Sequence, residues 1–139
     1  MSRQYYRKDT GIEARQVIEE WQLSFNLGCV LKYVCRAGLK PNVSSDSDIQ
    51  KALDYIDFEI DFYDRVLNRE TFIVPYNKLV LVPTYTPPDV LRDAWGLSTD
   101  QSNALKLIHL ASKEFLSYDL KSAIVALEDL IIVVMKLRS

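Results

Sequence analysis

The chain has 139 residues, of which 48% are hydrophobic and 26% are charged, and its formal net charge at pH 7 is −2. This length and composition predict one globular domain, residues 1–139, with a sizeable core. The sequence pI near 5.4 argues against a nucleic-acid polymer as partner, because such binding requires a basic field over a whole face. Any anion-binding site must therefore be local.

The start of the sequence lacks the basic segment, apolar run and small-residue cleavage site of a secretory signal, so we do not expect secretion. The most apolar run, Leu130 to Met135, is too short to cross a bilayer, and we expect no membrane partner. Cys29 and Cys35 have neither CxxC nor zinc-type spacing. We expect both to be small buried residues in a reducing cytosol.

Two helices are expected before residue 40. Thr10 and Glu13 have the spacing of a capping box, which predicts a helix that continues to about Gln22. Ser24 can cap a second helix, residues 25–37, whose broad apolar surface indicates a central position.

A third, longer helix is expected to complete the helical N-terminal segment, residues 1–68. Ser47 and Gln50 form a second possible capping box, and the helix is expected to reach about Asn68. Its apolar residues recur at alternating spacings of three and four, as in a packed helix. They are Ile49, Leu53, Ile56, Ile60, Tyr63 and Leu67.

The middle segment, residues 69–86, differs in character. Residues 71–74 and 79–82 are short β-branched and aliphatic runs separated by Pro75, Tyr76, Asn77 and Lys78. This pattern predicts a β-hairpin and then an extended connector. A lone hairpin is marginally stable, so we expect it to pack on helices or to pair with another subunit.

Residues 87–139 are expected to be helical again. Pro88 can begin a short helix that ends at Gly96, and Ser98 with Gln101 forms a third capping box for a helix to about Leu116. Asp119 then opens a final helix with a wide apolar stripe, which suits an oligomer contact as well as a core. The predicted fold is mainly α, a helical domain with a short β-hairpin insertion, forming a homo-oligomer such as a dimer or tetramer.

Three cations converge near the end of the second helix, within the segment GCVLKYVCRAGLK. Lys32 and Arg36 are four residues apart and share a face, and Gly38 can close the helix so that Lys40 returns nearby. Such a surface suits a phosphate. The alternative is an ordinary basic helix end that interacts with the last carbonyls and the helix dipole.

Aromatic residues could complete a nucleotide site by stacking a base. The candidates are Tyr5, Tyr6, Tyr33, Tyr55 and Trp95, although aromatic residues also commonly belong to a core. Tyr33 points about 100° away from Lys32 around the helix, so another segment or subunit must help it to reach the same ligand.

Four carboxylates, at Asp54, Asp57, Asp61 and Asp64, lie along one side of the long helix. Such a row could hold Mg²⁺, but a solvated acidic face or a partner for basic residues is the interpretation we adopt. The sequence contains neither a GxxxxGK[ST] phosphate loop nor a GxGxxG fingerprint. We expect no catalytic residue, no metal site and no cofactor, and we expect His109 to be packed.

Several short motifs resemble those of a known family. They are GIEARQVI at 11–18, FNLG at 25–28, LKY at 31–33, RAG at 36–38, Lys40 and KALDYI at 51–56. Together they make residues 6 to about 63 similar to the small phage-encoded domain DUF3310, whose members are often labelled nucleotide kinase. A His-Tyr pair common in that family is replaced here by Tyr5 and Tyr6, and the usual Asn after the glycine is Cys29.

This resemblance implies a phage protein that handles nucleotides in the host cytoplasm. We expect it to bind and sequester a host immune nucleotide, such as a cyclic oligonucleotide, without chemical turnover. Such a protein acts as a sponge, which counters the cyclic-oligonucleotide-based antiphage signalling system (anti-CBASS). Lys32, Arg36 and Lys40 would bind phosphates, and Tyr5, Tyr6, Tyr33 or Trp95 would contact the base. The enzymatic alternatives are a nucleoside monophosphate kinase and a Mg²⁺-dependent nucleotide phosphohydrolase.

Overall fold

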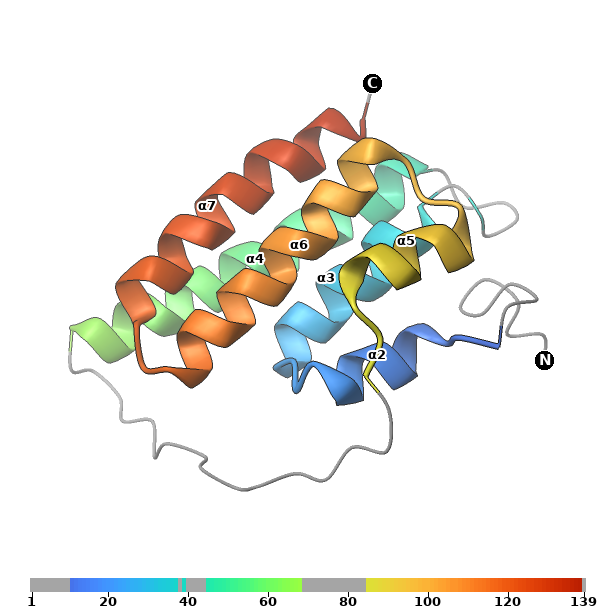
Figure 1. Ribbon diagram of the computed structural model, residues 1–139. Helices are drawn as coiled ribbons and strands as arrows, with labels where there is room; N and C mark the ends of the chain where they lie inside the picture. Colours follow the sequence, from blue (N-terminus) through green and yellow to red (C-terminus); the bar gives the residue numbers. More distant parts are fainter. Residues whose placement is uncertain (1–10, 38, 40–44, 69–84, 139) are drawn as a thin grey trace.

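The computed structural model describes residues 11–37, 39, 45–68 and 85–138, and every regular element in these ranges is an α-helix. Figure 1 shows their order along the chain. The helices are α2 (Ala14–Glu20), α3 (Phe25–Arg36), α4 (Ser45–Leu67), α5 (Pro88–Trp95), α6 (Thr99–Leu116) and α7 (Leu120–Lys136). Within the described ranges, none of these helices has the length and apolar character needed to cross a membrane.

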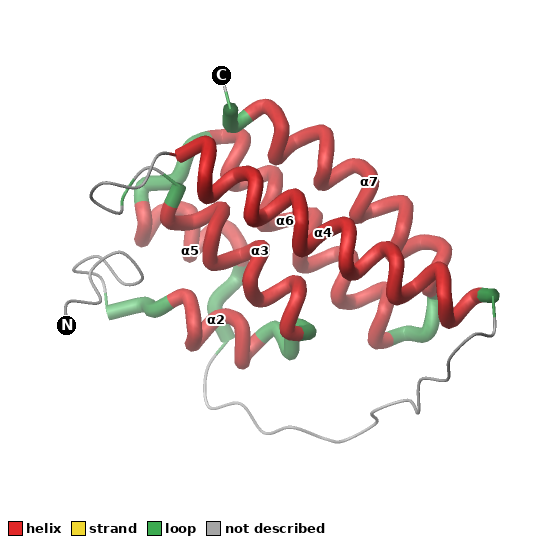
Figure 2. The backbone as a smooth tube through the Cα atoms, turned by 180° about the vertical axis from the view of Figure 1, so that it is seen from behind, coloured by secondary structure: helices red, strands yellow, loops and turns green. Residues whose placement is uncertain are grey.

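Four of the helices form a bundle. α3 packs on α4, α4 on α7, α7 on α6, and α6 on α3, so that each has two neighbours (Figures 1 and 2). Neighbouring helices run antiparallel: the Gln101 side chain near the start of α6 donates to the Val34 carbonyl near the end of α3. Arg138, just after α7, likewise donates to Gln50 near the start of α4. α2 covers α3, and α5 covers α6.

The bundle interior contains the apolar faces that the periodic patterns predict. Its largest fully buried side chains include Tyr63 of α4 and Trp95 of α5, together with aliphatic residues of α3, α4, α6 and α7. Cys35 is buried, as expected, and burial raises the pKa of its thiol to about 12. Cys29 is only half-buried.

Several predicted helix ends are confirmed. The Ser24 side chain accepts a hydrogen bond from the Leu27 N–H at the start of α3. At the start of α6, both hydrogen bonds of the capping box between Ser98 and Gln101 are present. The side chain of Asp119, the N-cap of α7, accepts a hydrogen bond from the Ser122 N–H. α5 begins at Pro88 and ends at Gly96, whose φ of 62° is the left-handed conformation that favours glycine at this position.

Two predicted caps differ from the structure. α2 begins at Ala14 after Glu13, which makes no side-chain cap bond, and Thr10 lies outside the described residues. α4 begins at Ser45, so Ser47 lies inside the helix and is not its cap. Asp46 and Asp48 occupy the first turn of α4, where a carboxylate interacts favourably with the positive end of the helix dipole.

The predicted β-hairpin is wrong as part of the fold class, because the structure is all-helical and contains no strand in the ranges that it describes. Residues 71–74 and 79–82, to which the hairpin was assigned, lie outside those ranges. β-Branched composition is a weak signal on its own, since a two-stranded hairpin needs a sheet or a helix face to support it. The described residues offer no strand that such a hairpin could extend.

The segment just before α5 is fixed to α2 and α6. The Thr86 N–H donates to Glu20, and the Trp21 indole N–H donates to the Thr86 carbonyl over 2.8 Å. The Tyr85 hydroxyl lies 2.5 Å from His109 Nε2 on α6, and the His109 ring meets Trp21 edge to face. His109 is therefore packed, as the sequence predicts.

We expect the protein to lose stability between about pH 7.5 and pH 5.5 because of His109. Burial, and then the nearby Lys113, lowers the pKa of His109 below its ordinary value. The unfolded chain therefore takes up a proton first as the pH falls through about 6.5, which favours unfolding. Urea unfolding at the two pH values measures the loss. Since His109 is the sole histidine, His109→Gln should remove most of this dependence, and an unchanged dependence would refute the assignment.

Candidate functional site

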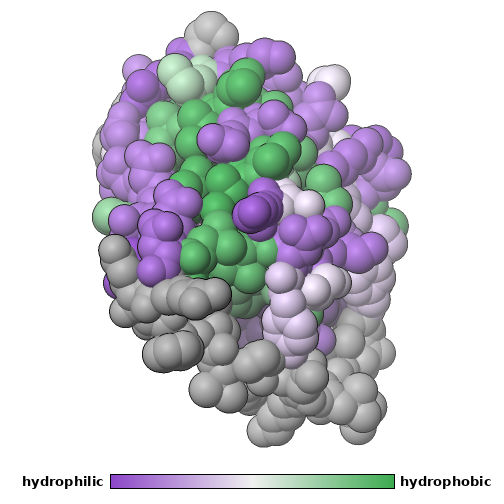
Figure 3. Space-filling view, turned by 90° about the vertical axis from the view of Figure 1, so that its left-hand side faces the viewer, coloured by the Kyte–Doolittle hydropathy of each residue, from purple (hydrophilic) through white to green (hydrophobic). Residues whose placement is uncertain are grey.

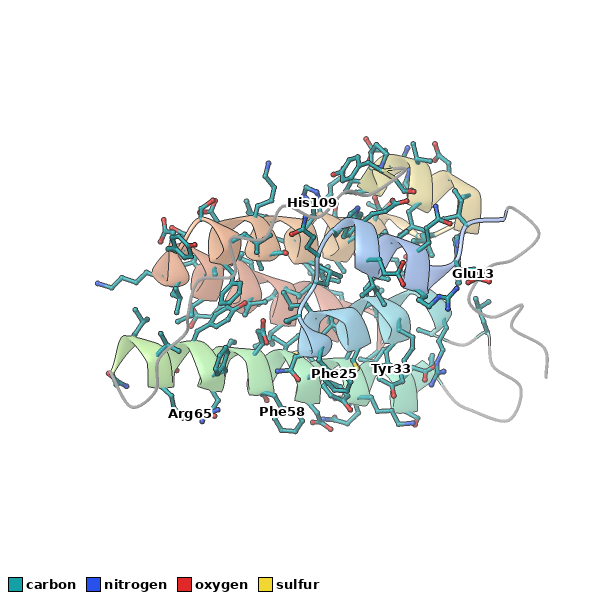
Figure 4. All side chains as sticks on the ribbon, turned by 90° about the horizontal axis from the view of Figure 1, so that it is seen from below. Glu13, Phe25, Tyr33, Phe58, Arg65 and His109 are labelled. Atoms are coloured by element: carbon teal, nitrogen blue, oxygen red, sulfur yellow. The ribbon has the colours of Figure 1, made fainter. Side chains whose placement is uncertain are left out.

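Four aromatic side chains gather on one side of the α3–α4 pair, and we call them the aromatic surface. Tyr33 of α3 stacks on Tyr55 of α4 with ring centroids 6.1 Å apart, and Tyr55 also meets Phe25 and Phe58 edge to face. Figure 4 shows Phe25, Tyr33 and Phe58 along the same side of the two helices. Phe25 is 76% exposed and Phe58 is 55% exposed. Such exposed aromatic groups can contact a ligand.

Three cations surround the Tyr33 ring. Lys32 Nζ and Arg36 Cζ lie 4.6 and 4.7 Å from its centroid, and Lys51 Nζ of α4 lies 5.5 Å away. These are distances at which a cation interacts favourably with an aromatic face. Lys51 is exposed and Lys32 is half-buried. α4 is therefore the second helix in the site. Lys32 itself lies over the Tyr33 ring, although the two side chains were expected to point about 100° apart.

Arg36 has a different role from the two lysines. Its Nε lies 3.4 Å from Asp48 Oδ1, and the side chains of Arg36 and Asp48 are 6% and 0% exposed. Asp48 Oδ2 has no hydrogen-bond partner among the described residues. The structure thus places Arg36 as a buried link between the end of α3 and the start of α4.

Trp95, another predicted site residue, is not brought together with this surface. Trp95 is 1% exposed and donates its indole N–H to the Ile12 carbonyl over 2.9 Å, so it is a core residue with no face open to a base. Tyr5, Tyr6 and Lys40 lie outside the described residues.

A buried carboxylate positions the other end of the aromatic surface. Glu59 of α4 is 2% exposed and accepts hydrogen bonds from Ser24, Asn26 and Tyr63 at 2.8, 3.0 and 2.6 Å. Burial, and then the Glu59 carboxylate, raises the pKa of Tyr63 far above its usual range. Because Ser24 and Asn26 flank Phe25 in sequence, Glu59 fixes the start of α3 beside Tyr55.

A small cavity of about 220 Å³ adjoins this surface. Its lining is mostly apolar, with the Lys32 side chain as its one cationic group among the described residues. The lining residues are Ile18, Leu23, Ser24, Phe25, Gly28, Cys29 and Lys32. A Cβ on Gly28 would lie 3.0 Å from Ile18 Cγ2, so glycine allows α2 and α3 to approach closely here.

The acidic row on α4 has the solvated character expected of it. Asp54 accepts a hydrogen bond from Gln50, and Asp61 pairs with Arg65 over 3.1 Å at the surface. The described residues contain no group of three or more His, Cys, Asp or Glu side chains that could hold a metal ion.

The sequence signals for three further site residues were present but weak. Lys51 precedes Tyr55 by four residues and Phe58 follows it by three, so all three share one face of α4. Phe25 and Tyr33 are eight residues apart, about two turns of α3. Glu59 carried no such signal, because a glutamate in a helix is usually exposed.

Residues 2–57 match the model of a family described as a protein of unknown function, DUF3310. The match confirms the resemblance that the short motifs predict for the N-terminal region of the chain. It covers α2, α3 and the first half of α4, and therefore most of the aromatic surface. No curated protein and no solved structure matched the chain.

We expect Asp48→Asn to destabilise the protein by about 3 kcal/mol or more, because it removes the carboxylate charge that pairs with the buried Arg36 guanidinium. The free energy of unfolding in urea measures the change. Asp61→Asn is a matched control that removes a carboxylate from the exposed pair with Arg65, and its effect should be small. Equal effects of the two substitutions would contradict a structural role for Arg36.

Proposed function

We propose that the protein binds a nucleotide on the aromatic surface of α3 and α4. The base would stack on the exposed rings of Phe25 or Phe58, and Lys32 and Lys51 would bind phosphate. The observation that carries this proposal is the position of the Lys32 and Lys51 amines within 4.6 and 5.5 Å of the Tyr33 ring centroid, at the end of a row of contacting aromatic rings.

The chemistry of this surface suits both parts of a nucleotide. Aromatic side chains stack on any base, since every base has a π face. Lysine amines bind phosphate as mobile point charges. The overall charge of −2 supports a small anionic ligand over a long polymer.

The two lysines come from different helices and lie near one tyrosine ring. This arrangement supports a ligand that carries more than one phosphate, such as a cyclic oligonucleotide. We propose that the protein sequesters such a host immune signal in the cytoplasm of the infected cell without converting it. It would do so as a homo-oligomer. Sequestration requires tight binding and many copies of the protein, and it requires no turnover.

We expect Lys32→Ala and Lys51→Ala each to weaken nucleotide binding about tenfold or more, because a hydrogen bond to a charged group contributes about 1.5–3 kcal/mol. Calorimetric titration with a cyclic dinucleotide measures the affinity, and thermal unfolding measures the stability. Lys106→Ala on α6 is the matched control, and it should leave the affinity unchanged. Equal affinities in all three variants would rule out this surface as the phosphate site.

A second experiment separates sequestration from catalysis. The protein is incubated with a labelled cyclic dinucleotide and, separately, with labelled nucleoside monophosphate plus ATP, in each case with Mg²⁺. After denaturation, chromatography should recover the dinucleotide intact and bound in proportion to the protein. A phosphorylated or hydrolysed product would overturn sequestration in favour of the kinase or the phosphohydrolase.

A further inference from the structure

α7 is apolar on two sides. Leu127, Leu130 and Val134 are buried in the bundle, whereas Val125 and Ile132 are 57% and 58% exposed. A surface helix normally has a polar outer face. Figure 3 shows a hydrophobic area on the side of the molecule where α7 lies, with hydrophilic residues at its borders and a few within it.

A shallow cavity of about 360 Å³ lies between α6 and α7 beside Val125. Leu110 of α6, with Val125 and Ala126 of α7, supplies its apolar lining. Lys121 and Asp129 of α7 and Glu114 of α6 are its charged lining residues. The cavity is thus a place where an apolar side chain from another helix could insert between charged groups.

Two charged residues of α7 on this face, Lys121 and Asp129, are spaced symmetrically about Val125, and Glu114 of α6 also lines the cavity. Lys121 lies four residues before Val125 and Asp129 four residues after it, so all three are on one face of α7. Neither Lys121 nor Asp129 forms an ion pair within the ranges that the structure describes.

Two antiparallel copies of α7 with a two-fold axis at Val125 would satisfy this pattern. Lys121 of one copy would then face Asp129 of the other, and the reverse contact would repeat the pair. Val125 would meet its own counterpart, and the exposed Ile132, seven residues later, would lie on the same face of α7. A face that complements itself in this way is what a two-fold interface requires.

We infer that α7 is a homodimer interface in which it packs antiparallel on α7 of a second copy, centred on Val125. The occupant is a second copy because the charges complement this same surface, which an unrelated partner would have no reason to match. The inference does not depend on nucleotide binding.

Exchanging the two charges tests the interface. Lys121→Asp or Asp129→Lys alone places like charges opposite each other twice per dimer, and each should raise the dimer dissociation constant about tenfold or more. The double variant K121D/D129K restores opposite charges and should return it close to the wild-type value. Analytical ultracentrifugation over a concentration series measures all four proteins.

Arg15→Asp on α2 is the control for the change of charge, because Arg15 is exposed and α2 packs on α3, away from α7. It should leave the dissociation constant unchanged. A monomeric wild type, single variants that associate like the wild type, or a double variant no better than the singles would each overturn the inference.

Cysteine cross-linking tests the register. Val125→Cys places two thiols at the axis, where they can form a disulfide, whereas Ile132→Cys thiols would be about 14 residues apart along the pair, or roughly 21 Å. Under mild oxidation, Val125→Cys should give a covalent dimer that the wild type and Ile132→Cys do not give. Equal cross-linking of the two variants would refute the axis at Val125.

Discussion

The register of α3 against α4 is the constraint on which the rest of the molecule depends. Two buried carboxylates of α4 fix this register. Asp48 pairs with Arg36 at the end of α3, and Glu59 accepts hydrogen bonds from the Ser24 and Asn26 side chains at the beginning of α3. Asp48 and Glu59 are eleven residues apart, about three helical turns, and so they share one face. A buried charge is costly without its partner, so a shifted register would be strongly unfavourable.

This register gives Arg36 and Lys32 different environments at the end of α3. Arg36 serves the contact with α4, and its charge is matched within the protein. Lys32 lies one turn earlier and on the open side, where Lys51 of α4 approaches the same tyrosine ring. Among the described residues, the candidate site thus draws one lysine from each helix, and the buried arginine holds those helices in place.

The sequence predicted the helices well because their signals are local. The caps at Ser24, Ser98 and Asp119 act within three residues, and the apolar periodicity identifies the buried faces. The hairpin prediction failed for a related reason, since β-branched runs specify a strand only when a neighbouring strand or surface completes the pairing.

The site was less predictable because it depends on contacts between helices. Periodicity places Tyr55 on a face of α4 but cannot show that Tyr33 stacks on it. Residue type was misleading for Arg36, Glu59 and Trp95: all three are buried, although Arg and Glu usually lie at the surface and Trp95 was expected to contact a base. Their burial follows from partners on other elements, which only the fold brings together.

The order of the helices in the bundle separates the two surfaces proposed here. α3 and α4 form one layer, which contains the aromatic surface, and α6 and α7 form the other, as Figure 4 shows. An antiparallel pair of α7 helices would join two copies through their α6–α7 layers. The aromatic surfaces would then face outward on both copies, so dimer formation would leave each Lys32 and Lys51 open to a ligand. Dimerisation and nucleotide binding are therefore physically compatible.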